Sequence, residues 1–189
     1  MFRRQRQVRH TNGTQPSDDQ HSRDASAWRR YQMRQQVFTL GNDYFIEDEQ
    51  GQKSYRIDGI VMRLRDTLVF RDMLGKELCK IQERRLRVKN TMEIEDTSGA
   101  RLAVVRKALI TPFRQRWEVE VGGTRELDIQ GDIFAHEYTL GEGREKMAEV
   151  SKKWFHVRDT YGVAIAPGQN DVLVLAITVA IDMMAHQGR

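Results

Sequence analysis

The residues of this sequence that could do chemistry are mainly cations near its middle. Arg85, Arg87 and Lys89 lie within five positions, and Arg106 and Lys107 form a second pair. Several such cations on one rim would hold phosphate groups by charge-assisted hydrogen bonds. We therefore predict that these five residues form a binding site for an anionic ligand. The alternative is a solvated face that nearby glutamates neutralise.

Catalytic and metal-binding patterns are missing from the sequence. The five histidines share no ligand spacing, and His136-Glu137 begins like a zinc-protease helix but has Leu140 where the second histidine would stand. The single cysteine, Cys79, is interpreted as a small core residue, and without a second cysteine no disulfide forms. We predict a protein that is not an enzyme and that needs no metal or cofactor.

One carboxylate, Asp182, stands in an apolar segment. Between Val172 and Ala185 only Thr178 and Asp182 are polar. A carboxylate in such surroundings should be paired, with a structural partner such as an arginine, or lie near the mouth of the barrel that is predicted below. The catalytic alternative for Asp182 is the weaker interpretation.

The segment around Asp182, residues 171–187, organises the chain. Its apolar residues lie on every side of a helical wheel, which is typical of a helix buried in protein or in a membrane. The apolar stretch is shorter than the roughly 20 residues that a bilayer requires. Its β-branched residues also fit a buried strand. The Pro167-Gly168 turn and the capping residues Asn170 and Asp171 favour the helix.

A repeat precedes this helix. Gly51, Gly75, Gly99 and Gly123 are spaced 24 residues apart, and an Asp stands three positions before each of the first three. Asp-x-x-Gly between alternating apolar residues predicts a hairpin, with glycine at a positive φ. Two more units, with turns at 141–143 and 159–162, bring the prediction to six hairpins and twelve strands.

Twelve antiparallel strands can close into a barrel, which removes exposed strand edges. Such a barrel is too wide for side chains alone to fill, whereas a helix about 10 Å across fits the space. We therefore predict a mostly β fold with one buried helix: a closed antiparallel barrel of about twelve strands around the central helix 171–187.

The charge lies in the N-terminal segment. Residues 1–30 carry seven Arg and three Asp, which leaves 24 basic and 24 acidic residues in 31–189. The segment is polar almost throughout, so we predict a disordered basic tail over 1–30 and a single domain over 31–189. It contains no apolar stretch typical of a secretory signal. A cytoplasmic protein without a transmembrane span and without a specific nucleic-acid partner is expected.

The chain resembles the tubby-like fold, and more closely its LURP-one-related branch, which includes relatives of the phospholipid scramblases. Four motifs carry the resemblance: RLRDTLVFRD (63–72), ERRLRVKNTMEIED (83–96), RKALITPFRQRWEVEV (106–121) and WFHVRDTYGVAIAPGQ (154–169). The resemblance implies the barrel with a central helix and no catalytic residue set. Tubby proteins bind phosphoinositide headgroups through a basic pocket. This sequence lacks the proline-rich N-terminus and the palmitoylated cysteine cluster of the scramblases.

The predicted function is a non-enzymatic binding module at the membrane periphery. It would recognise anionic lipid headgroups, phosphoinositide-like, or other phosphate groups through Arg85, Arg87, Lys89, Arg106 and Lys107. Two alternatives stay open: a scaffold for a protein partner, and a scramblase-like activity.

Overall fold

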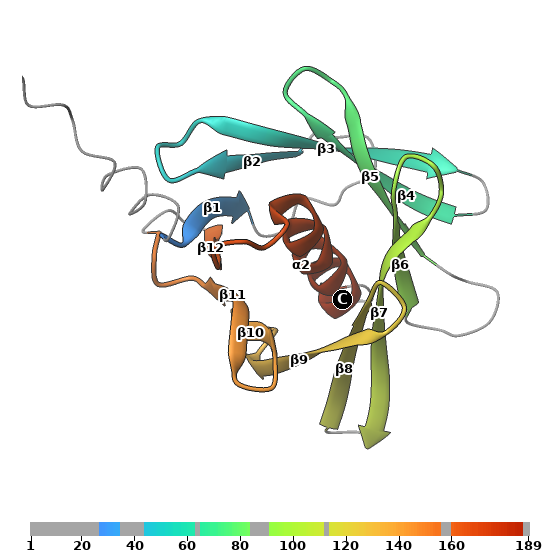
Figure 1. The fold of residues 1–189 in the computed structure, drawn as a ribbon, viewed down its shortest axis with the longest axis vertical. Coiled ribbons are helices and arrows are strands. Elements are labelled where there is room, and N and C mark those ends of the chain that lie inside the picture. The colour runs from blue at the N-terminus through green and yellow to red at the C-terminus, as the bar shows by residue number, and fades with distance from the viewer. Residues whose placement is uncertain are drawn as a thin grey trace, which may run out of the picture.

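The computed structural model describes residues 27–34, 44–62, 65–83, 91–111, 114–155 and 160–186. These residues form twelve strands and one helix, labelled in Figure 1. The strands are β1 (Arg29–Arg34), β2 (Tyr44–Asp48), β3 (Lys53–Met62), β4 (Arg65–Asp72), β5 (Glu77–Glu83), β6 (Thr91–Glu95), β7 (Arg101–Thr111), β8 (Arg114–Val121), β9 (Arg125–Asp132), β10 (Glu137–Glu142), β11 (Glu145–Ser151) and β12 (Thr160–Ile165).

The strands form a closed barrel in chain order. Each strand pairs antiparallel with the next, and β1 pairs with β12 over Arg29–Arg34 to close the ring. The predicted fold class is therefore confirmed. Figure 1 shows the helix, α2 (Asp171–His186), at the centre of the ring of strands.

The repeated turns have the predicted geometry. Gly51, Gly75 and Gly99 have φ values of 75°, 85° and 87°. In the β4–β5 turn, Oδ1 of Asp72 accepts hydrogen bonds from the backbone N–H groups of Leu74 and Lys76, both at 2.9 Å. The aspartate thus fixes the turn, and the glycine takes the left-handed conformation that other residues avoid.

The sixth predicted hairpin is wrong. Gly162, expected in a turn, lies inside β12, and the strand that completes the ring is β1. A Cβ atom at Gly162 would come within 2.7 Å of the rings of Trp154 and Phe155. This glycine therefore allows two aromatic rings to approach the backbone of β12.

The folded part begins at least two residues before the predicted boundary. Arg29, in β1, donates hydrogen bonds of 2.7 and 2.6 Å to the two carboxylate oxygens of Asp171, and the Tyr31 hydroxyl donates one of 2.8 Å. These contacts attach the first strand to the start of α2. Residues 1–26, which hold most of the predicted tail, lie outside the described residues.

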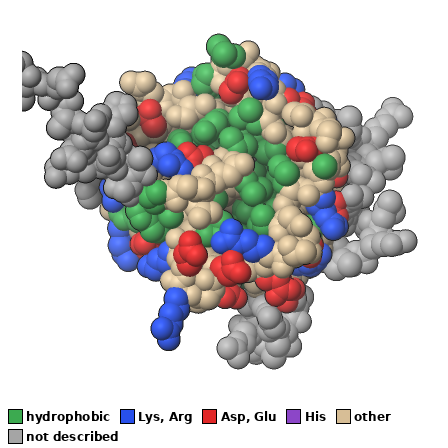
Figure 2. Space-filling view, in the orientation of Figure 1, with side chains coloured by type: hydrophobic (Ala, Val, Ile, Leu, Met, Phe, Trp, Pro, Cys, Tyr) green, Lys and Arg blue, Asp and Glu red, His purple; other side chains and the backbone are tan. Residues whose placement is uncertain are grey.

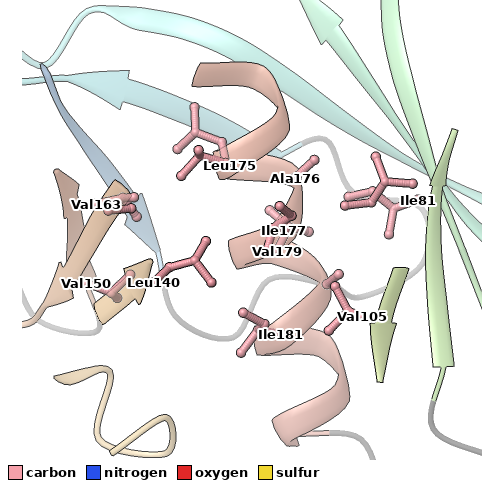
Figure 3. Close-up of a cluster of buried hydrophobic side chains, with 14 of the residues drawn as sticks. Ile81, Val105, Leu140, Val150, Val163, Leu175, Ala176, Ile177, Val179 and Ile181 are labelled. Atoms are coloured by element: carbon pink, nitrogen blue, oxygen red, sulfur yellow. The ribbon is translucent and has the colours of Figure 1, made fainter. Parts of the chain in front are cut away.

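Helix α2 fills the lumen. The side chain of Asn170 caps it by accepting a hydrogen bond from the N–H of Leu173 at 3.1 Å. Every residue from Val174 to Ile181 is buried. Figure 3 shows its Leu175, Ile177 and Ile181 among inward-pointing side chains of the wall, which include Ile81, Val105 and Val163. The predicted central helix is confirmed to His186; Gln187 lies outside the described residues.

Because the strands alternate in direction, their connections lie at two opposite ends of the barrel. The end at which α2 begins, together with the turns after β2, β4, β6, β8 and β10, is called the proximal end. The end at which α2 finishes, together with the connections after β1, β3, β5, β7, β9 and β11, is called the distal end.

Candidate functional site at the distal end

A buried acid–base pair joins α2 to the wall near the distal end. Nε2 of His136, in the β9–β10 connection, lies 2.7 Å from Oδ1 of Asp182 in the helix. The two side chains are only 2% and 5% exposed. His136 has a φ of 54°, the one positive value outside glycine among the residues that the structure describes. Asp182 therefore has a histidine partner instead of the expected arginine.

Three tyrosines surround this pair. The Tyr161 ring lies 4.3 Å from the His136 ring, centroid to centroid. Burial raises the pKa of Tyr138 and of Tyr161, and the nearby negative charge of Asp182 raises both further. Burial is also the main cause of the raised pKa of Tyr44. The cluster is closed to solvent, so a substrate cannot reach it while the barrel is intact.

Lys107 lies at the distal end of the lumen, beside the end of α2. Its Nζ donates a hydrogen bond of 3.4 Å to the backbone carbonyl of Met184, and it lies 5.2 Å from the Trp117 ring and 5.6 Å from the Phe134 ring. The last carbonyls of a helix have no partner within the helix, so a cation there is favourable. Burial lowers the pKa of Lys107.

Arg106 lies on the opposite face of the same strand. Its Nη1 is 3.0 Å from a carboxylate oxygen of Glu120. It also lines a shallow pocket of about 50 Å³ together with Glu118, Glu126 and Asp128. Because successive side chains of a strand point to opposite faces, Arg106 and Lys107 cannot share one site. The acidic surroundings of Arg106 also disfavour an anion there.

Arg85, Arg87 and Lys89 fall in residues 84–90, outside the described residues. The ends that this segment connects, Glu83 of β5 and Thr91 of β6, lie at the distal end. Of the five predicted site residues, the structure thus describes two, and it does not bring those two together.

The outer surface offers few other candidate sites. Figure 2 shows a hydrophobic area over the position of α2, with cationic and anionic side chains interspersed around it. A pocket of about 370 Å³ on the outside of β9–β11 is lined by Arg144 and Lys146 but also by Asp128 and Glu145. Within the described ranges, no three His, Cys, Asp or Glu side chains are placed to hold a metal ion. None of the described helical segments has the length and apolar character for crossing a bilayer.

Sequence reasoning missed His136. The apolar residues around Asp182 indicated that its carboxylate needs a partner, but they did not indicate which residue, because His136 lies 46 positions away in the sequence. Residue spacing does not show that the β9–β10 connection returns to the last turns of the helix.

Comparisons with known proteins agree with this architecture. Residues 29–182 match the profile of the LURP-one-related family. The uncharacterized protein YxjI of Bacillus subtilis (strain 168) is 27% identical over 154 residues, which cover 82% of this chain and 92% of YxjI. A crystal structure of an Arabidopsis thaliana protein has a TM-score of 0.61 and 15% identity, and the match covers 86% of this chain and 95% of that one. That structure is similar in fold. With the family profile matched over almost the whole barrel, the chain belongs to the LURP-one-related family.

Proposed function

We propose that this protein is a non-enzymatic binding module that attaches to anionic lipid surfaces through the distal end of its barrel. The first support is the filled lumen. Val174 to Ile181 are buried throughout, so α2 occupies the space in which other barrels hold a ligand. A ligand must therefore bind outside the lumen, at the wall or at one of the two ends.

The observation that carries the proposal is the difference between the two ends. The proximal turns contain polar Asp-x-x-Gly sequences such as DEQG (48–51) and DTSG (96–99). By contrast, the sequence between the distal strand ends Glu83 and Thr91 is RRLRVKN, with four cations and no acid. Each Lys or Arg near an anionic bilayer contributes about 1 kcal/mol, which salt weakens.

The non-enzymatic part of the proposal is supported by the closed His136–Asp182 pair. A general acid or base must come within hydrogen-bond reach of its substrate. With side-chain exposures of 2% and 5%, neither member of the pair has a path to one. The pair acts instead as a polar anchor for the helix.

Vesicle flotation tests the proposal. The protein is compared on phosphatidylcholine vesicles with and without phosphoinositide, as the full chain and with residues 1–26 removed. Arg29 is retained because it holds Asp171. We expect the shortened protein to prefer the anionic vesicles, and Arg85→Ala/Arg87→Ala to abolish that preference.

The matched control is Arg125→Ala/Arg144→Ala, which removes the same charge from the proximal end and should leave the preference intact. A shortened protein without any preference contradicts the proposal, and equal effects of the two double variants contradict the choice of the distal end. A scramblase-like activity is tested in parallel by following transfer of a fluorescent lipid between the leaflets.

The second candidate function is a protein-interaction scaffold, which one observation favours. The Leu74 side chain, at the apex of the β4–β5 turn, is 96% exposed. The turn beneath it is rigid, because Asp72 accepts its N–H groups and Arg71 Nη1 bonds to the Gly75 carbonyl at 3.1 Å. A rigid apolar side chain of this kind suits a pocket on another protein.

A further inference from the structure

We infer that Phe134 is the side chain of the distal end that enters the lipid bilayer, with Lys107 beside it facing the phosphate layer. The inference rests on the proposed function and names the described residues that would make the contact. A single exposed aromatic is common on protein surfaces. Three further observations distinguish Phe134 from an incidental one.

The first observation is its location. The large hydrophobic side chains exposed within the described ranges are Trp28, Met73, Leu74 and Phe134. Trp28 immediately precedes β1 at the proximal end, and Met73 and Leu74 belong to the proximal β4–β5 turn. Of these four described side chains, Phe134, which is 40% exposed, is the one at the distal end.

The second observation is the rigidity of the connection that carries Phe134. The N–H of Ala135 donates to Oδ1 of Asp132 at 3.0 Å, and the N–H of His136 donates to the Ile133 carbonyl at 3.1 Å. The side chain of His136 is in turn bonded to Asp182 inside the barrel. The backbone that carries Phe134 is therefore fixed before the protein meets a ligand, which lowers the entropy lost on binding.

The third observation is the cation beside the ring. Nζ of Lys107 lies 5.6 Å from the centroid of the Phe134 ring and 5.2 Å from that of Trp117. Aromatic rings beside a lysine are typical of the bilayer interface. Because the cation complements lipid phosphates, a bilayer suits this surface better than an uncharged protein pocket.

A polarity-sensitive dye reports on insertion in the full-length protein. It is attached at Phe134→Cys or, as the matched control at the other end, at Leu74→Cys. The native Cys79 will not compete, because burial raises the pKa of its thiol to about 12. On vesicles of phosphatidylcholine and phosphatidylserine, we expect a blue shift from position 134 and none from position 74.

Affinity for the same vesicles gives an independent measurement. Phe134→Ser should weaken binding about tenfold, since the apolar ring no longer leaves water. Phe134→Trp should retain affinity, and Leu74→Ser should change nothing. Lys107→Gln should reduce the preference for anionic vesicles without removing the binding to neutral ones that the ring provides. Thermal unfolding of each variant checks that the barrel is intact.

The outcomes separate the inference from the proposed function. If the wild-type protein binds anionic vesicles but Phe134→Ser binds equally well, the inference is wrong and the proposed function stands. A blue shift at position 74 alone would show that the proximal end inserts. Failure of the wild-type protein to bind any vesicle overturns both, and the protein-scaffold function would then be favoured.

Discussion

Nε2 of His136 lies 2.7 Å from Oδ1 of Asp182, and this contact joins the barrel wall to the helix inside it. The remaining contacts of that part of the helix are largely apolar and can slide, whereas a hydrogen bond has a fixed geometry. The pair therefore sets the depth and rotation of α2 within the lumen. At the other end of the helix, Arg29 and Tyr31 bind Asp171.

Removing Asp182 should destabilise the fold strongly. Asp182→Ala leaves His136 buried without its carboxylate, and breaking a buried pair in this way costs about 3–5 kcal/mol of the free energy of unfolding. Urea unfolding followed by circular dichroism measures the change. Arg125→Ala, which breaks the exposed pair with Glu142, is the control and should cost less than about 1 kcal/mol. Equal losses in the two variants would show that the buried pair does not anchor the helix.

Removing the helix should abolish folding. Six large apolar side chains of α2 are buried: Val174, Leu175, Ile177, Val179, Ile181 and Met184. Each contributes about 1.5–3 kcal/mol when buried, which together matches the ~5–15 kcal/mol stability of a whole domain. A chain ending at residue 170 should be insoluble or lack a cooperative thermal transition. A soluble truncated protein that melts cooperatively would contradict the role of α2 as the core.

Substitution of Gly75 should cost stability through the backbone alone. Its φ is 85°, and no atom lies within 4 Å of the place where a Cβ would stand. Gly75→Val should therefore lose about 1–2 kcal/mol of unfolding free energy by backbone strain. Gly75→Asn should lose less, because asparagine tolerates the left-handed conformation. Thermal denaturation compares the two, and equal melting temperatures would refute strain as the cause.

The tyrosines should resist ionisation until the barrel unfolds. Burial is the main cause of a raised pKa for each of the five: Tyr31, Tyr44, Tyr55, Tyr138 and Tyr161. The folded state thus favours the neutral phenol, so its contribution to stability is complete below the unfolded pKa of about 10 and is lost as the pH rises above it. Absorbance at the phenolate band should rise in one step that coincides with unfolding by circular dichroism. A gradual rise near pH 10 in folded protein would contradict this.

Local signals predicted most of the fold. The Asp-x-x-Gly turns could be predicted because they recur at a regular spacing. The segment 171–187 could be predicted as a buried helix because its residues are apolar on every side and must be surrounded by other apolar residues. The prediction of the sixth hairpin was wrong because Gly162 follows an aspartate at the same spacing as the turn glycines. The glycine instead leaves room for the rings of Trp154 and Phe155 to pack against β12. Such a contact between two segments cannot be seen from the spacing of residues along the sequence.

The site was harder to predict because it depends on which way side chains face. Arg106 and Lys107 are neighbours in sequence, yet one pairs with Glu120 outside the barrel and the other reaches Met184 inside it. The strand period alone implied that they diverge. Lys107 shares its face of β7 with the core residues Ala103 and Val105, and it stands opposite Trp117 of β8.

The pairing of β1 with β12 also has a consequence for synthesis. The ring cannot close until the last strand has left the ribosome, and the helix that fills it follows later still. Contacts between residues so distant in sequence make folding slow and leave unpaired strands exposed meanwhile. The nascent barrel therefore stays open until β12 has been translated, and it has no core until α2 has followed.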